Sequence, residues 1–306
     1  RVNLRSGPGT DQPVLCVLEP GTPVTIAGAS GDWLEVAAKG QAGFVNVQFV
    51  AQEQHAVPEG LIDGTGPFGD IALAPPDEKQ IKLAPGASSV DRTVAVTWNR
   101  SGNLLGALAD HLKFDAGCAV AVFGTESSGS GFAADGRMVI RFENHHFHQY
   151  WGQSHQPDFD GHFQFDGVKP WTAHQWRASE NDAFQPVHRS QSSEWSCFQC
   201  ACGFDEHAAK LSISMGGPQI LGSNYGEAGF ESVEQMYDAF ASGERRQIVA
   251  FFDFLQGPAT HPPKVLALQQ RDFIRFAQLY NGPGNAAEYG ARIAGCFDAF
   301  QRLRPV

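Results

Sequence analysis

The chain of 306 residues has a net charge of −11 at pH 7, with 42% hydrophobic, 11% aromatic and 18% charged residues. This length suits one large domain or two smaller ones, and the composition excludes disordered, coiled-coil and collagen-like proteins. The acidic balance argues against a nucleic-acid partner. No run of 18 apolar residues occurs, so we expect no membrane span.

Residues 1–50 are predicted to form a small all-β barrel. Short β-rich runs alternate with glycine turns such as Ser6-Gly7-Pro8-Gly9, and evenly spaced short strands are typical of barrels. The runs expected to be strands are Val14–Leu18, Pro23–Ala27, Trp33–Ala37 and Gly43–Val50. Residues 51–90 carry five prolines, which predicts a linker lying against a second domain.

Residues 91–306 are predicted to form a mainly helical domain. Apolar residues recur at helical spacing behind a possible cap at Ser101, and Ser232 with Gln235 forms a capping-box pattern. A last helix is expected over 286–302. Residues 144–207 are polar and irregular and hold eight of the eleven histidines. So long an irregular stretch is usually functional or held by disulfides.

Three acidic residues are candidates for catalysis. Glu126 follows the apolar run Cys118–Phe123 and precedes a Ser/Gly turn, an environment that raises a carboxyl pKa toward that of a general acid. Asp135 lies in an Asp-Gly turn, and Glu143 ends a strand-like run. Two carboxylates in different environments are what glycoside hydrolysis requires. The alternative for Glu126 is an ordinary acid at a helix end, and the alternative for Asp135 is a plain turn residue. The alternative for Glu143 is a structural hydrogen bond to the backbone.

Two glycine-rich segments could line a sugar-binding site. The first contains Gln219 and Tyr225, and the second contains Tyr280 and Asn281 in an Asn-Gly-Pro-Gly turn. Ordinary packed loops are the alternative for both.

Together these segments carry a family resemblance. Residues from about 91 to 303 resemble the N-acetylmuramidase domain of phage endolysins and of secreted fungal muramidases of glycoside hydrolase family 184. The matching stretches include Glu126–Phe132, Asp135–Arg137, Gln219–Gly222, Gly229–Val233 and Tyr280–Gly284. The resemblance implies a lysozyme-like (α+β) catalytic domain with Glu126 as the acid. Ser214-Met215-Gly216 departs from the Ser-Trp-Gly common in the family.

The first fifty residues resemble a bacterial-type SH3 domain. Val2–Gly9 matches its opening signature, and Gly31–Val36 and Gly43–Val45 match its later marks. Such modules typically bind peptidoglycan, and Asn3, Arg5 and Trp33 are the candidate binding residues. The chain is thus expected to be a multidomain protein: an SH3-like domain (1–50), a linker (51–90) and a muramidase domain (91–306).

The six cysteines allow two interpretations. A secreted chain would pair them as disulfides, with Cys16 bridging the domains if every cysteine is paired. Zinc is the lesser alternative: Cys197, Cys200 and Cys202 with His207 have partial zinc-site character, and His145, His146, His148, His155 and His162 add nitrogens. We therefore expect no cofactor and no metal.

The sequence thus predicts a secreted, monomeric, antimicrobial muramidase whose partner is bacterial peptidoglycan, without nucleic-acid or membrane partners. It would hydrolyse the β-1,4 bond between N-acetylmuramic acid and N-acetylglucosamine. The alternatives are a lytic transglycosylase and a non-catalytic wall-binding protein. The chain begins at Arg1 without an apolar leader, as expected of a processed product. Asn99-Arg100-Ser101 is the only glycosylation sequon, and its use is open.

Overall fold

The computed structural model describes residues 2–19, 22, 24–30, 33–46, 49–50, 68–127, 129–257 and 262–305. Residues 51–67 of the expected linker lie outside these ranges, as do Pro23 and residues 47–48 of the expected strands. Within these ranges, no helix combines the length and apolarity needed to cross a membrane.

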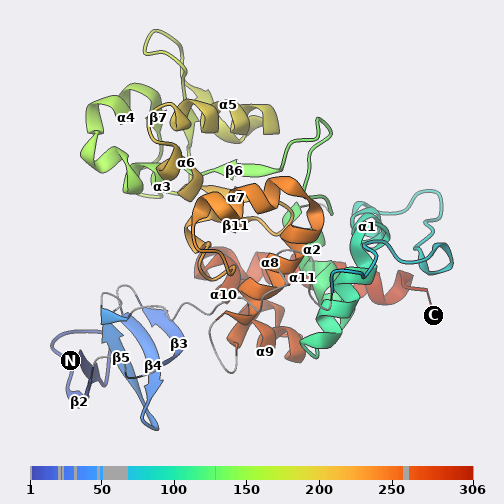
Figure 1. Cartoon of the computed structure of the whole chain (residues 1–306), viewed down its shortest axis with the longest axis horizontal. Coiled ribbons are helices and arrows are strands. Elements are labelled where there is room, and N and C mark those ends of the chain that lie inside the picture. The colour runs from blue at the N-terminus through green and yellow to red at the C-terminus, as the bar shows by residue number, and fades with distance from the viewer. Residues whose placement is uncertain are drawn as a thin grey trace.

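The N-terminal part is one antiparallel five-stranded sheet with the order β2-β1-β5-β4-β3 (Figure 1). Its core consists of small and medium aliphatic side chains, which are Leu4, Leu18, Val36, Ala38 and Val45. Lys39 and Gly40 join β4 to β5, and both have positive φ, as a type I′ hairpin turn requires. The strands are β1 (Val2–Arg5), β2 (Val14–Leu18), β3 (Thr25–Ser30), β4 (Trp33–Ala38) and β5 (Gln41–Asn46).

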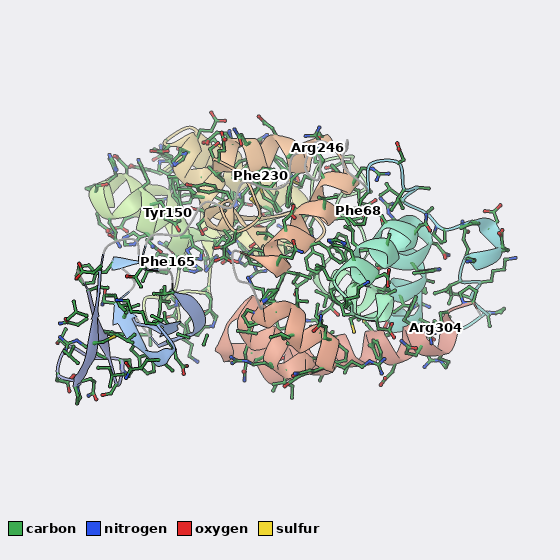
Figure 2. The ribbon with its side chains drawn as sticks, turned by 60° about the horizontal axis from the view of Figure 1, so that its bottom comes forward. Phe68, Tyr150, Phe165, Phe230, Arg246 and Arg304 are labelled. Carbon is green, nitrogen blue, oxygen red and sulfur yellow. The ribbon has the colours of Figure 1, made fainter. Side chains whose placement is uncertain are left out.

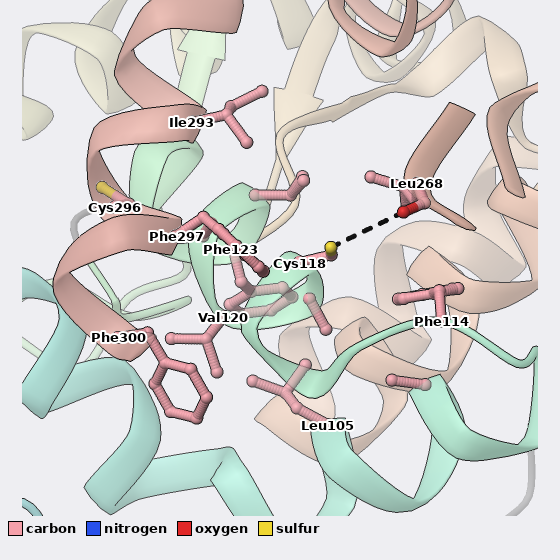
Figure 3. Close-up of a cluster of buried hydrophobic side chains, with 14 of the residues drawn as sticks. Leu105, Phe114, Cys118, Val120, Phe123, Leu268, Ile293, Cys296, Phe297 and Phe300 are labelled. Atoms are coloured by element: carbon pink, nitrogen blue, oxygen red, sulfur yellow. Dashed lines mark hydrogen bonds between the residues drawn. The ribbon is translucent and has the colours of Figure 1, made fainter. Parts of the chain in front are cut away.

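The rest of the chain is mainly helical and has two clusters of buried side chains. The first cluster lies among α1 (Ser89–His111), α2 (Ala116–Ser127), α8 (Glu244–Gln256), α9 (Pro263–Gln270), α10 (Phe273–Asn281) and α11 (Ala286–Leu303). Figure 3 shows α2 at its centre, with Val120 and Phe123 beside Phe297 and Phe300 of α11.

The second cluster lies under a three-stranded sheet with the order β11-β10-β6 and the helices around it. Its elements are β6 (Ile140–Phe142), α3 (Asn144–Tyr150), α4 (Gln156–His162), α5 (Gln191–Cys202), α6 (Glu206–Leu211), β10 (Ile213–Met215), β11 (Ile220–Leu221) and α7 (Val233–Ser242). A second small sheet joins β7 (Phe163–Gln164), β8 (Gln175–Trp176) and β9 (Gln185–Pro186). The expected irregular stretch 144–207 therefore contains three α-helices and the start of a fourth.

Helix α8 belongs to both clusters. Phe251, Phe252 and Leu255 face the first cluster, and Ala250 and Phe254 face the second. The buried Gln247 accepts from Gly217 N at 2.8 Å and donates to Phe240 O at 2.9 Å. Helix α8 is thus the shared wall of the two clusters.

The start of α1 differs from the prediction. The helix begins at Ser89, and Ser88 caps it in a reciprocal capping box with Asp91. Ser101 is buried inside the helix, because the apolar face extends back to Val94. Ser232 caps α7 as predicted, although Gln235 accepts from Glu231 N instead of closing the box.

The expected disulfides are absent from the structure. All six cysteines lie in the described ranges, and each carries a free thiol. Cys118 Sγ, for example, faces Leu268 O at 3.6 Å inside the first cluster (Figure 3). The Asn99 carboxamide bonds the backbone N and O of Ile81 at 2.8 and 3.0 Å. Because its Nδ2 is used in this way, Asn99 is a poor glycan acceptor.

Asp253 provides a test of the α8 packing. Its Oδ2 is buried without a hydrogen-bond partner among the described residues, and burial raises its pKa to about 7. The folded protein therefore keeps a proton that the unfolded chain loses above about pH 4, so stability falls as the pH rises from 4 to 7. We expect Asp253→Asn to be more stable than wild type at pH 8, by up to about 4 kcal/mol. The difference should shrink toward pH 4.

Urea unfolding across this pH range measures the effect. The exposed Asp298→Asn on α11 is the matched control and should follow wild type. Parallel pH profiles for wild type and Asp253→Asn would contradict a buried, protonated Asp253.

Candidate active site

Glu126 lies in the last turn of α2 and is partly buried. The helix before it is apolar, and residues 118–123 are fully buried. Burial raises the pKa of Glu126 to about 7, while the hydrogen bond from Asn281 and the charge of Arg292 lower it. The carboxyl group can therefore hold a proton near neutral pH and release it to a substrate.

The end of α10 fixes the position of the Glu126 carboxyl group. Asn281 Nδ2 donates to Glu126 Oε1 at 3.1 Å. The preceding residue, Tyr280, donates its hydroxyl to Pro218 O at 2.7 Å, and its ring packs on both buried clusters. Gly282 follows with φ of 86°, a conformation that favours glycine and ends the helix.

Two residues near Glu126 were not predicted, Tyr289 and Arg292 of α11. Burial and the Glu126 charge raise the pKa of Tyr289, and the Arg292 guanidinium lies 5.3 Å from its ring centre. Their spacing of three residues places both on one face of a helix. This spacing can be seen in the sequence, but no sequence pattern indicates that α11 packs beside α2.

Asp135 occupies a different environment. It lies in the turn between Phe132 and Met138, which form an isolated bridge. Its carboxylate is exposed and accepts from Arg137 Nε at 2.8 Å, and this hydrogen bond holds its pKa below the usual range. Among the described residues, no hydrogen bond or ion pair joins Asp135 to Glu126.

Glu143 directly follows β6 and faces a cluster of histidines. Its Oε1 accepts from Arg141 Nε at 2.7 Å. Its Oε2 lies 3.3 Å from His174 Nδ1 and 3.7 Å from His145 Nδ1. The Arg141 charge also lowers the pKa of Tyr289, which connects this cluster electrostatically to the Glu126 region.

The sugar-binding candidates are only partly brought together. Asn281 contacts Glu126, and Tyr280 binds the loop that carries Gln219. Gln219 Nε2 donates to Gly216 O at 2.7 Å within its own loop. Tyr225 packs against the second buried cluster, and no described interaction places it at Glu126.

The three candidates in the β-domain lie on one side of its sheet. Side chains alternate along a strand, and Leu4, Val36 and Val45 point into the core. Asn3, Arg5 and Trp33 therefore point away from the core. Asn3 is exposed, and Trp33, opposite Asn46, is half-buried.

The cysteine-based zinc arrangement is not found in the described structure. His207 pairs with Glu234 at 2.8 Å instead of approaching the cysteines of α5. Among the residues that the structure describes, Glu143, His145 and His174 form a group of side chains that could hold a metal ion.

Comparisons with known proteins agree with this architecture. The family model described as N-acetylmuramidase matches residues 115–301, and the bacterial SH3 domain model matches residues 1–51. The crystal structure of the Burkholderia AP3 phage endolysin is similar in fold, with a TM-score of 0.50 and 23% identity. The similarity covers 72% of this chain and 74% of that chain. No curated protein sequence matches.

The environment of Glu126 can be tested by titration. Asn281→Ala removes a hydrogen bond that favours the carboxylate, so we expect the pKa of Glu126 to rise further above its ordinary value. Arg292→Gln should act in the same direction by removing a positive charge. Carboxyl ¹³C chemical shifts recorded against pH measure both effects. An unchanged or lower pKa in both variants would contradict the described contacts.

Proposed function

The chain belongs to the N-acetylmuramidase family, and on that premise we propose that it hydrolyses the β-1,4 bond between N-acetylmuramic acid and N-acetylglucosamine. Membership makes it a glycoside hydrolase that cleaves peptidoglycan. The observation that carries the finer proposal is Glu126, a partly buried carboxyl group with a pKa raised to about 7.

In this proposal Glu126 is the general acid. Its Oε1 accepts from Asn281, so the acidic proton resides on Oε2 and can pass to the glycosidic oxygen. After the transfer, the Asn281 amide and the Arg292 charge stabilise the carboxylate. The same two groups thus favour proton release, while burial keeps the acid protonated beforehand.

Asp135 is the second carboxylate that we propose. Its pairing with Arg137 keeps it ionised, as required for activating water or stabilising positive charge on the sugar ring. Glu143 is the weaker candidate, because Arg141 binds its Oε1 and its Oε2 is buried against the histidine cluster. For sugar binding we keep Tyr280 and Asn281 together with Gln219 and Tyr225.

The β-domain supplies wall binding in this proposal. Residues 1–50 contribute a charge of about −1, so the remaining residues carry about −10 of the total −11. An acidic enzyme gains no electrostatic attraction to an anionic wall, and a tethered binding module compensates by raising local concentration. Action on the wall also accords with a secreted, antimicrobial monomer.

Lysis of purified peptidoglycan tests the catalytic assignment. We expect Glu126→Gln to lower the lysis rate by about a thousandfold or more, because no other acid replaces it. Asp135→Asn should cost about tenfold or more, and Glu143→Gln should cost less if it binds no water or sugar. Near-normal lysis by Glu126→Gln would overturn the proposal.

Mass spectrometry of the released fragments separates the two enzymatic reactions. Hydrolysis yields reducing ends, whereas a lytic transglycosylase yields 1,6-anhydro ends that are lighter by one water. Anhydro products from the wild type would replace hydrolysis with transglycosylation while leaving Glu126 as the acid.

Sedimentation with insoluble peptidoglycan tests the β-domain. We expect Trp33→Ala and Asn3→Ala to reduce binding several-fold when introduced into the inactive Glu126→Gln chain. Exposed Lys39, in the turn between β4 and β5 and away from Asn3 and Trp33, offers a control in Lys39→Gln. Unchanged binding in both variants would exclude this face of the sheet as the wall-binding surface.

A further inference from the structure

We propose that Glu143, His145 and His174 form a structural site for a divalent transition-metal ion of the zinc type. Their ligand atoms all lie within 4.8 Å of one another. They come from three places in the chain: the residue after β6, the first turn of α3 and the residue before β8. The site is independent of the proposed catalytic role of Glu126.

Two polar atoms of this cluster lack hydrogen-bond partners. Glu143 Oε2 and His145 Nδ1 are both buried, and neither has a partner among the described residues. Each such atom normally costs stability, since burial removes its bonds to water. The 3.3 Å and 3.7 Å contacts to Glu143 Oε2 are therefore close approaches that are not hydrogen bonds.

The tautomer of His174 directs a lone pair into the cluster. His174 Nε2 lies 2.8 Å from Pro170 O, which can only accept, so Nε2 carries the proton. In neutral imidazole Nδ1 then offers its lone pair. The side chain is fully buried, and Nδ1 lies 3.3 Å from the carboxylate oxygen Glu143 Oε2. Two electron-rich atoms at this distance repel each other, and the Arg141 charge is bonded to the other carboxylate oxygen, so a cation between them would remove the repulsion.

A proton alone does not satisfy the cluster. His188 Nε2 lies 3.2 Å from His174 Nδ1, and His188 Nδ1 lies 2.8 Å from Glu194 Oε1. A proton on His188 Nε2 would give His174 Nδ1 a hydrogen bond. Glu143 Oε2 and His145 Nδ1 would still be unpartnered. A single cation among the three atoms serves all of them.

The distances and the donor types fit a tetrahedral ion. Bonds of about 2.1 Å place tetrahedral ligand atoms about 3.4 Å apart, close to the observed 3.3 and 3.7 Å. Two imidazole nitrogens with one carboxylate suit zinc. Calcium and magnesium prefer oxygen ligands throughout, which disfavours them here.

A second layer of contacts holds the ligands in place. Asn144, between Glu143 and His145, donates to Gln164 O and Gln175 O, both at 2.7 Å. Its side chain thus joins the start of α3 to the backbone beside His174. Phe165, labelled in Figure 2, packs against the ring of His145. Such outer contacts preorganise metal ligands.

The site also explains how the segment between β7 and α5 is held. Its regular structure consists of two-residue strands and one short 3-10 helix (Val187–Arg189), and it contains no disulfide. A bound ion would tie His174, at its middle, to β6 and α3. We therefore assign the ion a stabilising role.

Metal binding by the full-length chain tests this inference. After treatment with a chelator and removal of the chelator, we expect calorimetry to show one equivalent of Zn²⁺ bound and the melting temperature to rise on its addition. Co²⁺ should give the visible absorption bands of a tetrahedral nitrogen and oxygen site. Ca²⁺ and Mg²⁺ should shift neither signal.

Substitutions identify the ligands. Loss of an outer contact typically costs 10–100-fold in metal affinity, so His145→Ala and His174→Ala should each cost at least about 100-fold. His145 is partly exposed, so His145→Ala tests the site even if His174→Ala fails to fold. His207→Ala, at an exposed histidine paired with Glu234, is the matched control and should bind as wild type does.

Three results would overturn the inference. They are the absence of stoichiometric Zn²⁺ binding, unchanged affinity in His145→Ala, and thiolate-to-cobalt charge-transfer bands, which would assign the ion to cysteines. Because none of these readouts depends on lysis, failure here leaves the assignment of Glu126 untouched.

Discussion

Burial of α8 on both sides is the constraint on which the rest of the helical architecture depends. A helix that is apolar on most of its faces must be surrounded, and α8 is enclosed by α1, α2 and α9 on one side and by the sheet cluster on the other. Gln247 adds a polar connection from this helix to the loop before β11. The loop carrying Pro218 is thereby positioned to accept the Tyr280 hydroxyl, and Tyr280 is followed by the Asn281 that bonds Glu126.

Three carboxyl groups close in sequence have three different environments. Glu126 is desolvated at a helix end, Asp135 is exposed beside an arginine, and Glu143 is enclosed by histidines. Nearby charge and solvent access, and not the residue type, therefore determine the proposed roles: Glu126 as proton donor, Asp135 as anion and Glu143 as metal ligand. The proposed metal site removes Glu143 from the catalytic candidates for a reason that its sequence position could not supply.

The sequence predicted those features that depend on local pattern. Strands β2 and β4, the cap at Ser232 and the last helix follow from turn residues and apolar spacing, and the structure confirms them. Strand β1 was not predicted, and β3 and β5 differ from the prediction in their bounds. The start of α1 was misplaced, because an interior serine looks like a cap until the buried face before it is known. The approach of His174 to Glu143 and of Arg292 to Glu126 depends on chain packing over long separations, and no local pattern records it.

The free thiols have a consequence for where this chain can fold. Cys118, Cys197 and Cys296 are buried, and burial raises the pKa of each thiol, so they remain protonated and weakly nucleophilic at neutral pH. No covalent crosslink has to form before the helical core closes. The described fold therefore does not rely on disulfide formation, and a reducing environment would remove no crosslink from it.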